Sequence, residues 1–200
     1  MINPNWVIIG AIIAFLGSVS YVVDTLKGKV KPNRVSWGLW TTSSFIAFAA
    51  EVKQGVGIQS LMTFMVGFSP LLVFLASFIN KKAYWQLGKF DLICGGFSIL
   101  GLILWQLTGI GNLAIVFSIF ADLSAGIPTL VKAYKYPETE NYWEYATAAI
   151  NAVLTMFTFT CWTLKYYGFP LYIFLYDFIG FMLIKFKFGK RIDRIAQVSR

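Results

Sequence analysis

Long apolar runs separated by short polar segments make up most of the chain. A hydrocarbon core about 30 Å thick needs roughly 20 mostly apolar residues in a helix that crosses it. The runs are continuous and lack the alternation typical of membrane-barrel strands, and backbone groups in lipid must then be satisfied within helices. Seven membrane-spanning helices are predicted, at residues 6–26, 35–52, 58–79, 90–107, 112–131, 142–164 and 169–188.

Composition favours an all-α membrane protein. Hydrophobic residues make up 58% of the 200 positions and charged residues only 13%, whereas about a quarter of a typical soluble domain is charged. This length leaves room for seven spans with short loops and for no separate soluble domain. The segment before the first span has no basic residue, so we expect that span to be kept rather than removed as a signal peptide.

The residue types exclude several kinds of chemistry. The chain contains no histidine, and its two cysteines, Cys94 and Cys161, both lie in apolar runs. They therefore provide neither a disulfide framework nor a zinc site. An intramembrane enzyme would want clustered acids, histidine or cysteine at motif spacing, and no such motif is present. We predict no enzyme activity, no catalytic residue, no metal site and no cofactor.

Basic residues fall almost entirely on one side of the predicted spans. Fifteen lysines and arginines follow or close odd-numbered spans, and only Lys53 and Lys165 follow even-numbered ones. The positive-inside rule places the fifteen in the cytoplasm and the N-terminus outside, and we expect the inner membrane of a bacterium. Anionic lipid explains the net charge of +8, so the bilayer is an expected partner and nucleic acid is not. The fifteen lie in residues 27–34, 81–89, 132–135 and 185–200.

Residues 21–40 and 126–145 indicate an internal repeat. In both, a Thr-Leu pair near a helix end leads through lysines to a proline, and an aromatic residue follows five positions later. Pro32 then corresponds to Pro137 and Trp40 to Tyr145, although the Thr-Leu pairs align only with a one-residue gap. The alternative is that lysine, proline and interfacial tryptophan occur in any cytoplasmic helix–loop–helix segment.

The span count is compatible with two equivalent triplets of helices. An odd number of helices between spans 1–3 and 5–7 gives both triplets the same orientation, and carriers with parallel repeats place their solute near the midplane between them. We therefore predict a 3+1+3 plan, with residues 1–82 as the first triple-helix repeat and 83–111 as a linker helix. Residues 112–200 form the second repeat and a basic cytoplasmic tail.

With this plan the chain resembles the SWEET and PQ-loop transporter superfamily. The motif of that family is a Pro-Gln pair at the cytoplasmic end of the first helix of each triplet. Pro128-Thr129 stands at the second of these places and Asp24-Thr25 at the first. The glutamine is absent from both copies and the proline from the first. The resemblance implies a seven-helix carrier with alternating access, and it does not imply a particular substrate.

Two acids lie at positions where placing an acidic side chain in the membrane costs free energy. Asp122 and Asp177 fall near the centres of the fifth and seventh spans, where an acid costs about 2.5–3.5 kcal/mol. Such groups face the bundle interior, where they carry a proton or bind a cationic part of a substrate. We predict proton coupling for both and substrate binding for Asp177. The structural alternative is a hydrogen bond from a neighbour such as Ser118, Tyr176 or Asn151.

Other polar residues complete the predicted site. Aromatic rings beside hydroxyl groups suit a flat or sugar-like solute, although interfacial belts and helix packing use the same residue types. SWEET-like pockets use Asn and Trp from the corresponding helices, which favours Trp40 and Asn151. The predicted substrate-binding residues are Trp40, Ser44, Ser69, Asn151 and Asp177.

Residues of the helix ends and kinks complete the predictions. Asp24, Asp91 and Glu144 lie at cytoplasmic helix ends, where solvation or lysine pairing is expected, although Asp24 replaces a motif proline and is a candidate gate. Pro70 and Pro128 interrupt backbone hydrogen bonds and are candidate hinges. The predicted function is a small-solute transporter, either a facilitator or proton-coupled. The alternative is a receptor or assembly factor without transport, and a homo-oligomer is compatible with either.

Overall fold

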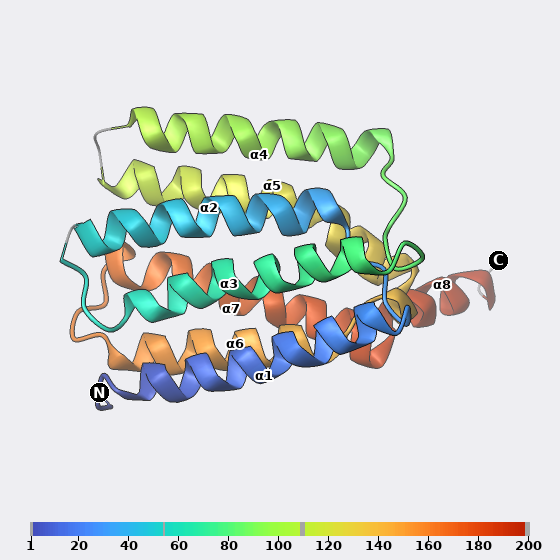
Figure 1. Ribbon diagram of the computed structural model, residues 1–200, viewed down its shortest axis with the longest axis horizontal. Helices are drawn as coiled ribbons and strands as arrows, with labels where there is room; N and C mark the ends of the chain where they lie inside the picture. The colour runs from blue at the N-terminus through green and yellow to red at the C-terminus, as the bar shows by residue number, and fades with distance from the viewer. Residues whose placement is uncertain (1, 54, 109–110, 199–200) are drawn as a thin grey trace.

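The computed structural model describes residues 2–53, 55–108 and 111–198, which form helices and no strand (Figure 1). The predicted all-α class is confirmed. The helices are α1 (Trp6–Leu26), α2 (Arg34–Lys53), α3 (Ser60–Ile79), α4 (Lys89–Leu107), α5 (Gly111–Lys135), the short 3-10 helix η1 (Pro137–Thr139), α6 (Tyr142–Thr158), α7 (Leu164–Phe186) and α8 (Phe188–Val198).

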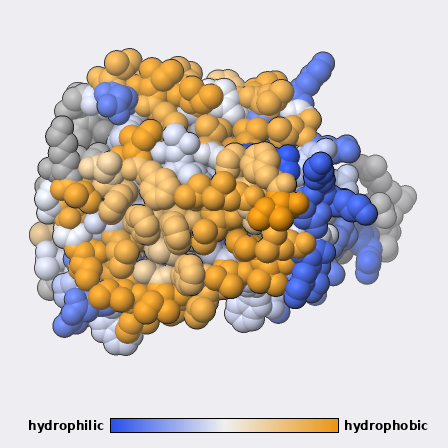
Figure 2. All heavy atoms as spheres, in the orientation of Figure 1, coloured by the Kyte–Doolittle hydropathy of each residue, from blue (hydrophilic) through white to orange (hydrophobic). Residues whose placement is uncertain are grey.

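Helices α1 to α7 lie side by side and alternate in direction along the bundle (Figure 1). The connections α1–α2, α3–α4 and α5–α6 lie at one end together with α8, and we call this the basic end. The N-terminus and the other connections lie at the opposite end. Figure 2 shows hydrophilic residues gathered at the basic end and hydrophobic residues over the flank of the bundle, as expected for helices that face lipid.

Five helices are long and apolar enough to cross a membrane, namely α1, α3, α4 and the segments Ile115–Lys135 of α5 and Tyr166–Phe186 of α7. They make the chain a multi-pass membrane protein. The other two long helices are less apolar or shorter. Helix α2 carries charged residues near both ends and a run of hydroxyl residues, and α6 has only 17 residues.

Helix boundaries follow the prediction where the hydropathy changes sharply. Helix α1 has the predicted bounds. Helix α6 ends at Thr158, before the predicted end at 164, and α7 begins at Leu164, before the predicted start at 169. The connection between them is itself apolar and rich in threonine, so hydropathy does not mark it. The predicted basic tail contains α8, and Lys187, with a φ of 52°, separates it from α7.

Two groups of three helices share one packing order. Helix α3 packs along both α1 and α2, whereas the backbones of α1 and α2 do not approach each other within the described residues, although the rings of Tyr21 and Trp37 meet between them. Helix α7 likewise packs along both α5 and α6, whose backbones do not approach each other in the described part of the chain. The groups meet through α1 with α6, extensively, and through α2 with α5, less extensively. Helix α4 packs on α5 and more lightly on α2.

Glycines bring α1 close to α6. A methyl group added at Gly17 would lie 1.9 Å from Oγ1 of Thr147 and 3.1 Å from the carbonyl oxygen of Trp143, and one at Gly10 would lie 2.5 Å from Oδ1 of Asn151. Small residues allow such close approach between helices in membranes. The α1–α6 contact therefore depends on the absence of a side chain at these two positions.

An asparagine begins the second helix of each group. Oδ1 of Asn33 accepts backbone N–H groups of the first turn of α2, and Oδ1 of Asn141 does the same for α6, which satisfies donors that a helix start leaves unpaired. The Nδ2 groups then donate to Asp91, at 2.5 Å, and to Asp24, at 2.7 Å. Solvation or lysine pairing was expected for both acids, and Lys29 does lie 3.7 Å from Asp24. Asp91 is instead buried and hydrogen-bonded to Asn33.

These caps suggest a different alignment of the two loops from the one the prolines give. Asn141 follows Asn33 by 108 residues, whereas Pro137 follows Pro32 by 105. When the caps are aligned, Tyr145 corresponds to Trp37 rather than to Trp40. The difference lies in the helices, because α1 ends at its Thr-Leu pair whereas α5 continues beyond its own pair to Lys135.

Candidate functional site

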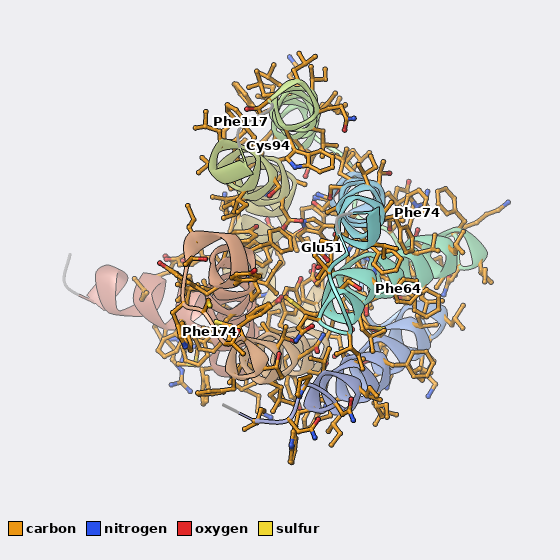
Figure 3. The ribbon with its side chains drawn as sticks, turned by 90° about the vertical axis from the view of Figure 1, so that its left-hand side faces the viewer. Glu51, Phe64, Phe74, Cys94, Phe117 and Phe174 are labelled. Carbon is orange, nitrogen blue, oxygen red and sulfur yellow. The ribbon has the colours of Figure 1, made fainter. Side chains whose placement is uncertain are left out.

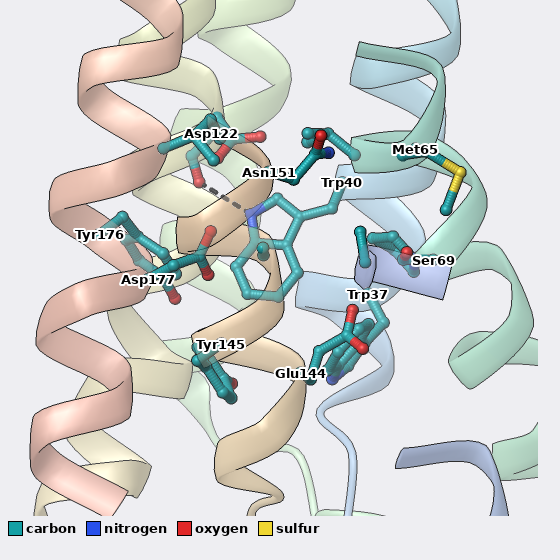
Figure 4. A pocket seen from close by; sticks show the side chains of 15 residues that line it. Trp37, Trp40, Met65, Ser69, Asp122, Glu144, Tyr145, Asn151, Tyr176 and Asp177 are labelled. Carbon is teal, nitrogen blue, oxygen red and sulfur yellow. Dashed lines mark hydrogen bonds between the residues drawn. The ribbon is translucent and has the colours of Figure 1, made fainter. Parts of the chain in front are cut away.

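A cavity lies between the two groups of helices (Figure 4). All six helices of the groups line it, and α4 contributes no lining residue within the described parts of the chain. Its volume is about 60 Å³, below the roughly 300–1,000 Å³ of small-molecule sites, so a bound organic solute would require the cavity to widen. Polar and aromatic side chains face it, among them Trp37, Trp40, Ser69, Asp122, Glu144, Tyr145, Asn151, Tyr176 and Asp177.

The structure brings most of the predicted site residues together and leaves three apart. Ser44 lines a second, smaller cavity that shares Asp122 with the first. Pro128 is buried within α5 and lines neither cavity. Asp24 lies at the basic end against Asn141. The predicted residues that line the main cavity are Trp40, Ser69, Pro70, Asp122, Asn151 and Asp177.

Asp122 connects α5 to both neighbouring helices. Its Oδ2 accepts a hydrogen bond from the hydroxyl of Tyr172 on α7 at 2.8 Å, and its backbone oxygen accepts from Nε1 of Trp40 on α2 at 3.1 Å. Oδ1 is buried and has no partner among the described residues. Ser118, one of the partners that the structural alternative named, donates instead to the carbonyl of Ile115. One carboxylate oxygen of Asp122 therefore remains unsatisfied.

Asp177 has no protein partner in the described part of the chain. No hydrogen bond or ion pair reaches its carboxylate there, although the side chain is half-buried and lines the cavity. The hydroxyl of the adjacent Tyr176 donates to the carbonyl of Gly126 at 2.9 Å and not to Asp177. Asp177 and Trp40 line the same cavity and are both labelled in Figure 4. An acid that is held inside a membrane bundle without a partner is typical of a site for a solute or proton.

Glu144 is a cavity residue that the sequence analysis placed in solvent or beside a lysine. It lies in the first turn of α6 but is buried, because its side chain faces the cavity and Ser18 of α1. Oε1 accepts from Ser18 on α1 at 3.4 Å, and Oε2 has no partner within the described residues. The spacing of Glu144, Ala148 and Asn151 along one helical face is the signal in the sequence that could have identified it.

The charges of the cavity are of one sign. Asp122, Glu144 and Asp177 line it, and no lysine or arginine does so among the described residues. Asp177 is close enough to interact electrostatically with the other two acids. Like charges that share an enclosed site cannot all ionise without compensation, so this cavity requires protons, a cation or both.

Asn151 provides a neutral polar group at the same site. It is only 2% exposed, and its Oδ1 has no hydrogen-bond partner in the described structure. Buried polar atoms without a partner are few in native proteins and usually meet water or a ligand. Asn151 therefore offers a solute an unused hydrogen-bonding group.

Aromatic rings form the wall of the cavity nearest the basic end. The rings of Trp37 and Trp40 meet edge to face with centroids 5.4 Å apart, and Trp40 meets Tyr176 in the same way at 5.7 Å. Tyr21 packs on Trp37 at 4.8 Å. Edge-to-face pairs of this kind are favoured by the ring quadrupole. Because backbone carbonyls accept from Trp40 and Tyr176, these two rings are held in fixed orientations.

A buried ion pair lies beyond the aromatic wall, at the basic end. Nζ of Lys132 is 2.5 Å from Oε1 of Glu140, and both side chains are at most 1% exposed. Oε2 of Glu140 accepts from the hydroxyls of Tyr21 at 2.7 Å and Tyr145 at 3.2 Å, and Lys132 also donates to the carbonyl of Lys31. The pair thus joins α1, α5, α6 and two connecting loops at the basic end.

Comparisons with known proteins identify no relative. No family model matches the chain, and neither a curated protein nor a solved structure matches it. Among the residues that the structure describes, no group of three or more cysteines, aspartates and glutamates could hold a metal ion. The chemistry of the cavity is therefore the basis on which a function is inferred.

Proposed function

We propose that this chain is a small-solute transporter that crosses the membrane seven times, with α1–α3 and α5–α7 as parallel triplets and α4 as a linker helix. The common packing order supports this plan, because the third helix lies between the first and second in both groups. The two asparagine caps support it independently, because each begins the second helix of its triplet. On this proposal α2 and α6 cross the membrane inside the bundle, where less apolar helices are tolerated.

The proposed orientation places the basic end in the cytoplasm, in agreement with the positive-inside rule. Fourteen of the fifteen basic residues lie within the described residues, and all fourteen belong to segments at that end. The N-terminus is then outside and the C-terminus inside. We propose the bacterial inner membrane as the location.

The cavity between the triplets is the observation that carries the transporter proposal. It combines three carboxyl groups, an unpartnered asparagine and fixed aromatic rings, and residues of both triplets contribute to it. Such a mixture of apolar walls with a few polar groups is typical of a small-molecule site. A receptor or assembly factor on the same scaffold would not need unpaired acids in the middle of the bundle.

Alternating access would follow from relative motion of the triplets about this cavity. At the basic end Tyr21 and the carbonyl of Lys31, in the first triplet, bond to Glu140 and Lys132, in the second, so solute release into the cytoplasm by motion of the triplets would require these two contacts to separate. Pro70 lines the cavity within α3, and Pro128 lies within α5. Both are proposed as hinges, since proline removes a backbone hydrogen bond from the helix interior.

Uptake into proteoliposomes tests the transporter proposal. The purified full chain would be reconstituted and offered radiolabelled sugars, amino acids, amines and vitamin precursors, with protein-free vesicles as the control. We expect saturable uptake of at least one class, inhibited by unlabelled solute. If no solute enters faster than in the control vesicles and none changes the thermal stability of the protein, the transporter proposal is wrong.

Proton coupling is tested separately, at Asp122. For a transported solute, Asp122→Asn should abolish the dependence of uptake on an imposed pH gradient while leaving binding of the solute in place. Asp193→Asn on α8 is the matched control, because Asp193 is exposed and lies outside the cavity. Uptake by Asp122→Asn that still follows the pH gradient would exclude Asp122 as the proton carrier.

A further inference from the structure

The acids of the bundle extend beyond the main cavity toward the opposite end. Glu51 lies in the last turn of α2, and Figure 3, viewed from the opposite end, shows it on the inner side of that helix. Oε1 accepts from Oγ1 of Thr63 on α3 at 3.0 Å, while Oε2 is buried and has no partner in the described structure. Glu51 is thus a fourth acid with no basic partner among the described residues, and it lies near the end of the bundle opposite the Lys132–Glu140 pair.

A stripe of residues along α2 connects Glu51 to the main cavity. Trp40, Ser44, Ala47 and Glu51 recur at intervals of four, three and four residues, which places them on one face of a helix. At about 1.5 Å per residue the stripe is roughly 16 Å long. Trp40 lines the main cavity, and Ser44 and Ala47 line the smaller cavity that shares Asp122 with it.

Buried polar atoms without a partner in the described structure also lie between the main cavity and Glu51, on helices that line the cavity. Oγ of Ser44 and Oγ1 of Thr155 are buried and have no partner within the described residues, as is the case for Oδ1 of Asn151. Thr155 lies one turn beyond Asn151 toward the opposite end of α6. Since such atoms normally meet water or a ligand, the half of the bundle between the cavity and Glu51 offers a polar solute hydrogen bonds that the protein leaves unmade.

The walls of the main cavity suit a cation in a second respect. Trp40 and Tyr176 are rings of the kind whose faces attract ammonium and guanidinium groups. Their polar atoms already bond to backbone carbonyls, which leaves ring surface rather than a hydrogen-bonding group for the solute. An anion would meet three acids and no base among the described lining residues.

We infer that the cavity binds a small organic cation, carrying an ammonium or guanidinium group, and that Glu51 receives it from the opposite end. Asp177 is the counter-ion in the cavity, because its carboxylate has no other partner in the described structure and shares the cavity with Trp40. Asn151 supplies the hydrogen bond that orients the remainder of the solute. This inference names the substrate class of the proposed transporter and rests on that proposal.

Pairs of isosteric compounds test the charge requirement directly. Choline would be compared with 3,3-dimethyl-1-butanol, and arginine with citrulline, by thermal unfolding of the purified full chain in detergent. A ligand that binds only the folded state raises the unfolding temperature with its concentration. We expect at least one cationic member to do so and its neutral partner to have no effect at the same concentration. Equal protection by both members of each pair, or protection by neither, would overturn the inference.

Two variants test the assigned residues for a cation that binds. Asp177→Asn should weaken its affinity by about 30-fold or more, as when one side of a buried charge pair is removed. Glu51→Gln should slow association, followed by tryptophan fluorescence, by roughly 10-fold through lost electrostatic steering, with a smaller change in equilibrium affinity. Asp193→Asn should change neither quantity. An unchanged affinity in Asp177→Asn, or an unchanged association rate in Glu51→Gln, would contradict the corresponding assignment.

Failure of this inference is distinguishable from failure of the transporter proposal. Saturable uptake of a neutral sugar, with no protection by any of the cations, would overturn the cation inference and leave the transporter. Binding of a cation without uptake into proteoliposomes would support the cation site and exclude transport, as expected for a receptor on the same scaffold.

Discussion

Removal of one member of the buried Lys132–Glu140 pair is expected to destabilise the protein strongly. Both side chains are at most 1% exposed and lie 2.5 Å apart, so Lys132→Met leaves a buried carboxylate and Glu140→Gln leaves a buried ammonium group. Breaking a buried pair in this way costs about 3–5 kcal/mol. Because the two tyrosine hydroxyls on Glu140 remain in Lys132→Met, each partly compensating the carboxylate, we expect that variant at the lower end of this range.

A double variant measures the interaction energy between Lys132 and Glu140 separately from the interactions of each residue with its surroundings. Replacing both partners removes both charges, and a buried pair replaced by uncharged groups of similar size is often close to neutral in stability. We expect Lys132→Met with Glu140→Gln to lose at least about 2 kcal/mol less than the sum of the single variants, a coupling within the range for residues in contact. The free energy of unfolding would be measured in mixed micelles by titration with a denaturing detergent and followed by tryptophan fluorescence.

An exposed pair in the same protein is the control. Lys190 lies 2.6 Å from Glu138, but their side chains are 46% and 51% exposed, and exposed pairs contribute about 0–1 kcal/mol. Lys190→Met should therefore have a small effect. Single variants of the buried pair that cost less than about 1 kcal/mol, or costs that add in the double variant, would refute the view that this pair stabilises the closed basic end.

Three further predictions concern the helix contacts. Gly17→Ala should destabilise the protein by about 1–3 kcal/mol through overpacking against α6, whereas Gly96→Ala, where an added methyl group meets nothing within 4 Å, should be neutral or stabilising; equal effects on the unfolding temperature would contradict this. Asn141→Ala should cost about 1–2 kcal/mol through loss of the α6 cap, measured by the same unfolding titration. Partial burial acts to raise the pKa of the Glu138 carboxyl, but the hydrogen bond from Lys190 holds this pKa below its usual range. The contact of α8 with the bundle should therefore be fully present above the ordinary glutamate pKa and weaken as the pH falls through the lowered pKa. The mobility of a spin label on α8 would report this, and mobility that does not change with pH would exclude a role for the pair in holding α8.

The helix bounds that follow hydropathy and the acids that interrupt apolar runs could be predicted from the sequence. The bounds of α1 are as predicted because the apolar run stops abruptly at Lys27. Asp122 and Asp177 were identified because each interrupts a long apolar run, and both line the cavity. The packing order of the helices could not be predicted in this way, since it depends on contacts between segments far apart in sequence.

The remainder of the site depends on tertiary structure that no local pattern describes. Glu144 lies close to a helix start, where solvation or lysine pairing was expected, but its side chain faces Ser18 of α1 and the cavity. The hydrogen bond from Tyr172 to Asp122 joins α7 to α5, and tyrosine is common throughout this chain, so its position did not distinguish it. Helix α8 was not predicted because its amphipathic sequence follows a cluster of lysines that alone would explain a tail.

The unequal contacts between the triplets have a mechanical consequence. Gly10 and Gly17 let α1 lie directly against α6, whereas α2 and α5 meet over a smaller area. If the two groups of helices move relative to each other, the motion is expected to be a rotation about the α1–α6 contact, because the groups are joined more tightly there than at α2–α5. The gap would then open between α2 and α5. Helix α4 packs on both α2 and α5. It would therefore limit the angle through which the two groups can rotate.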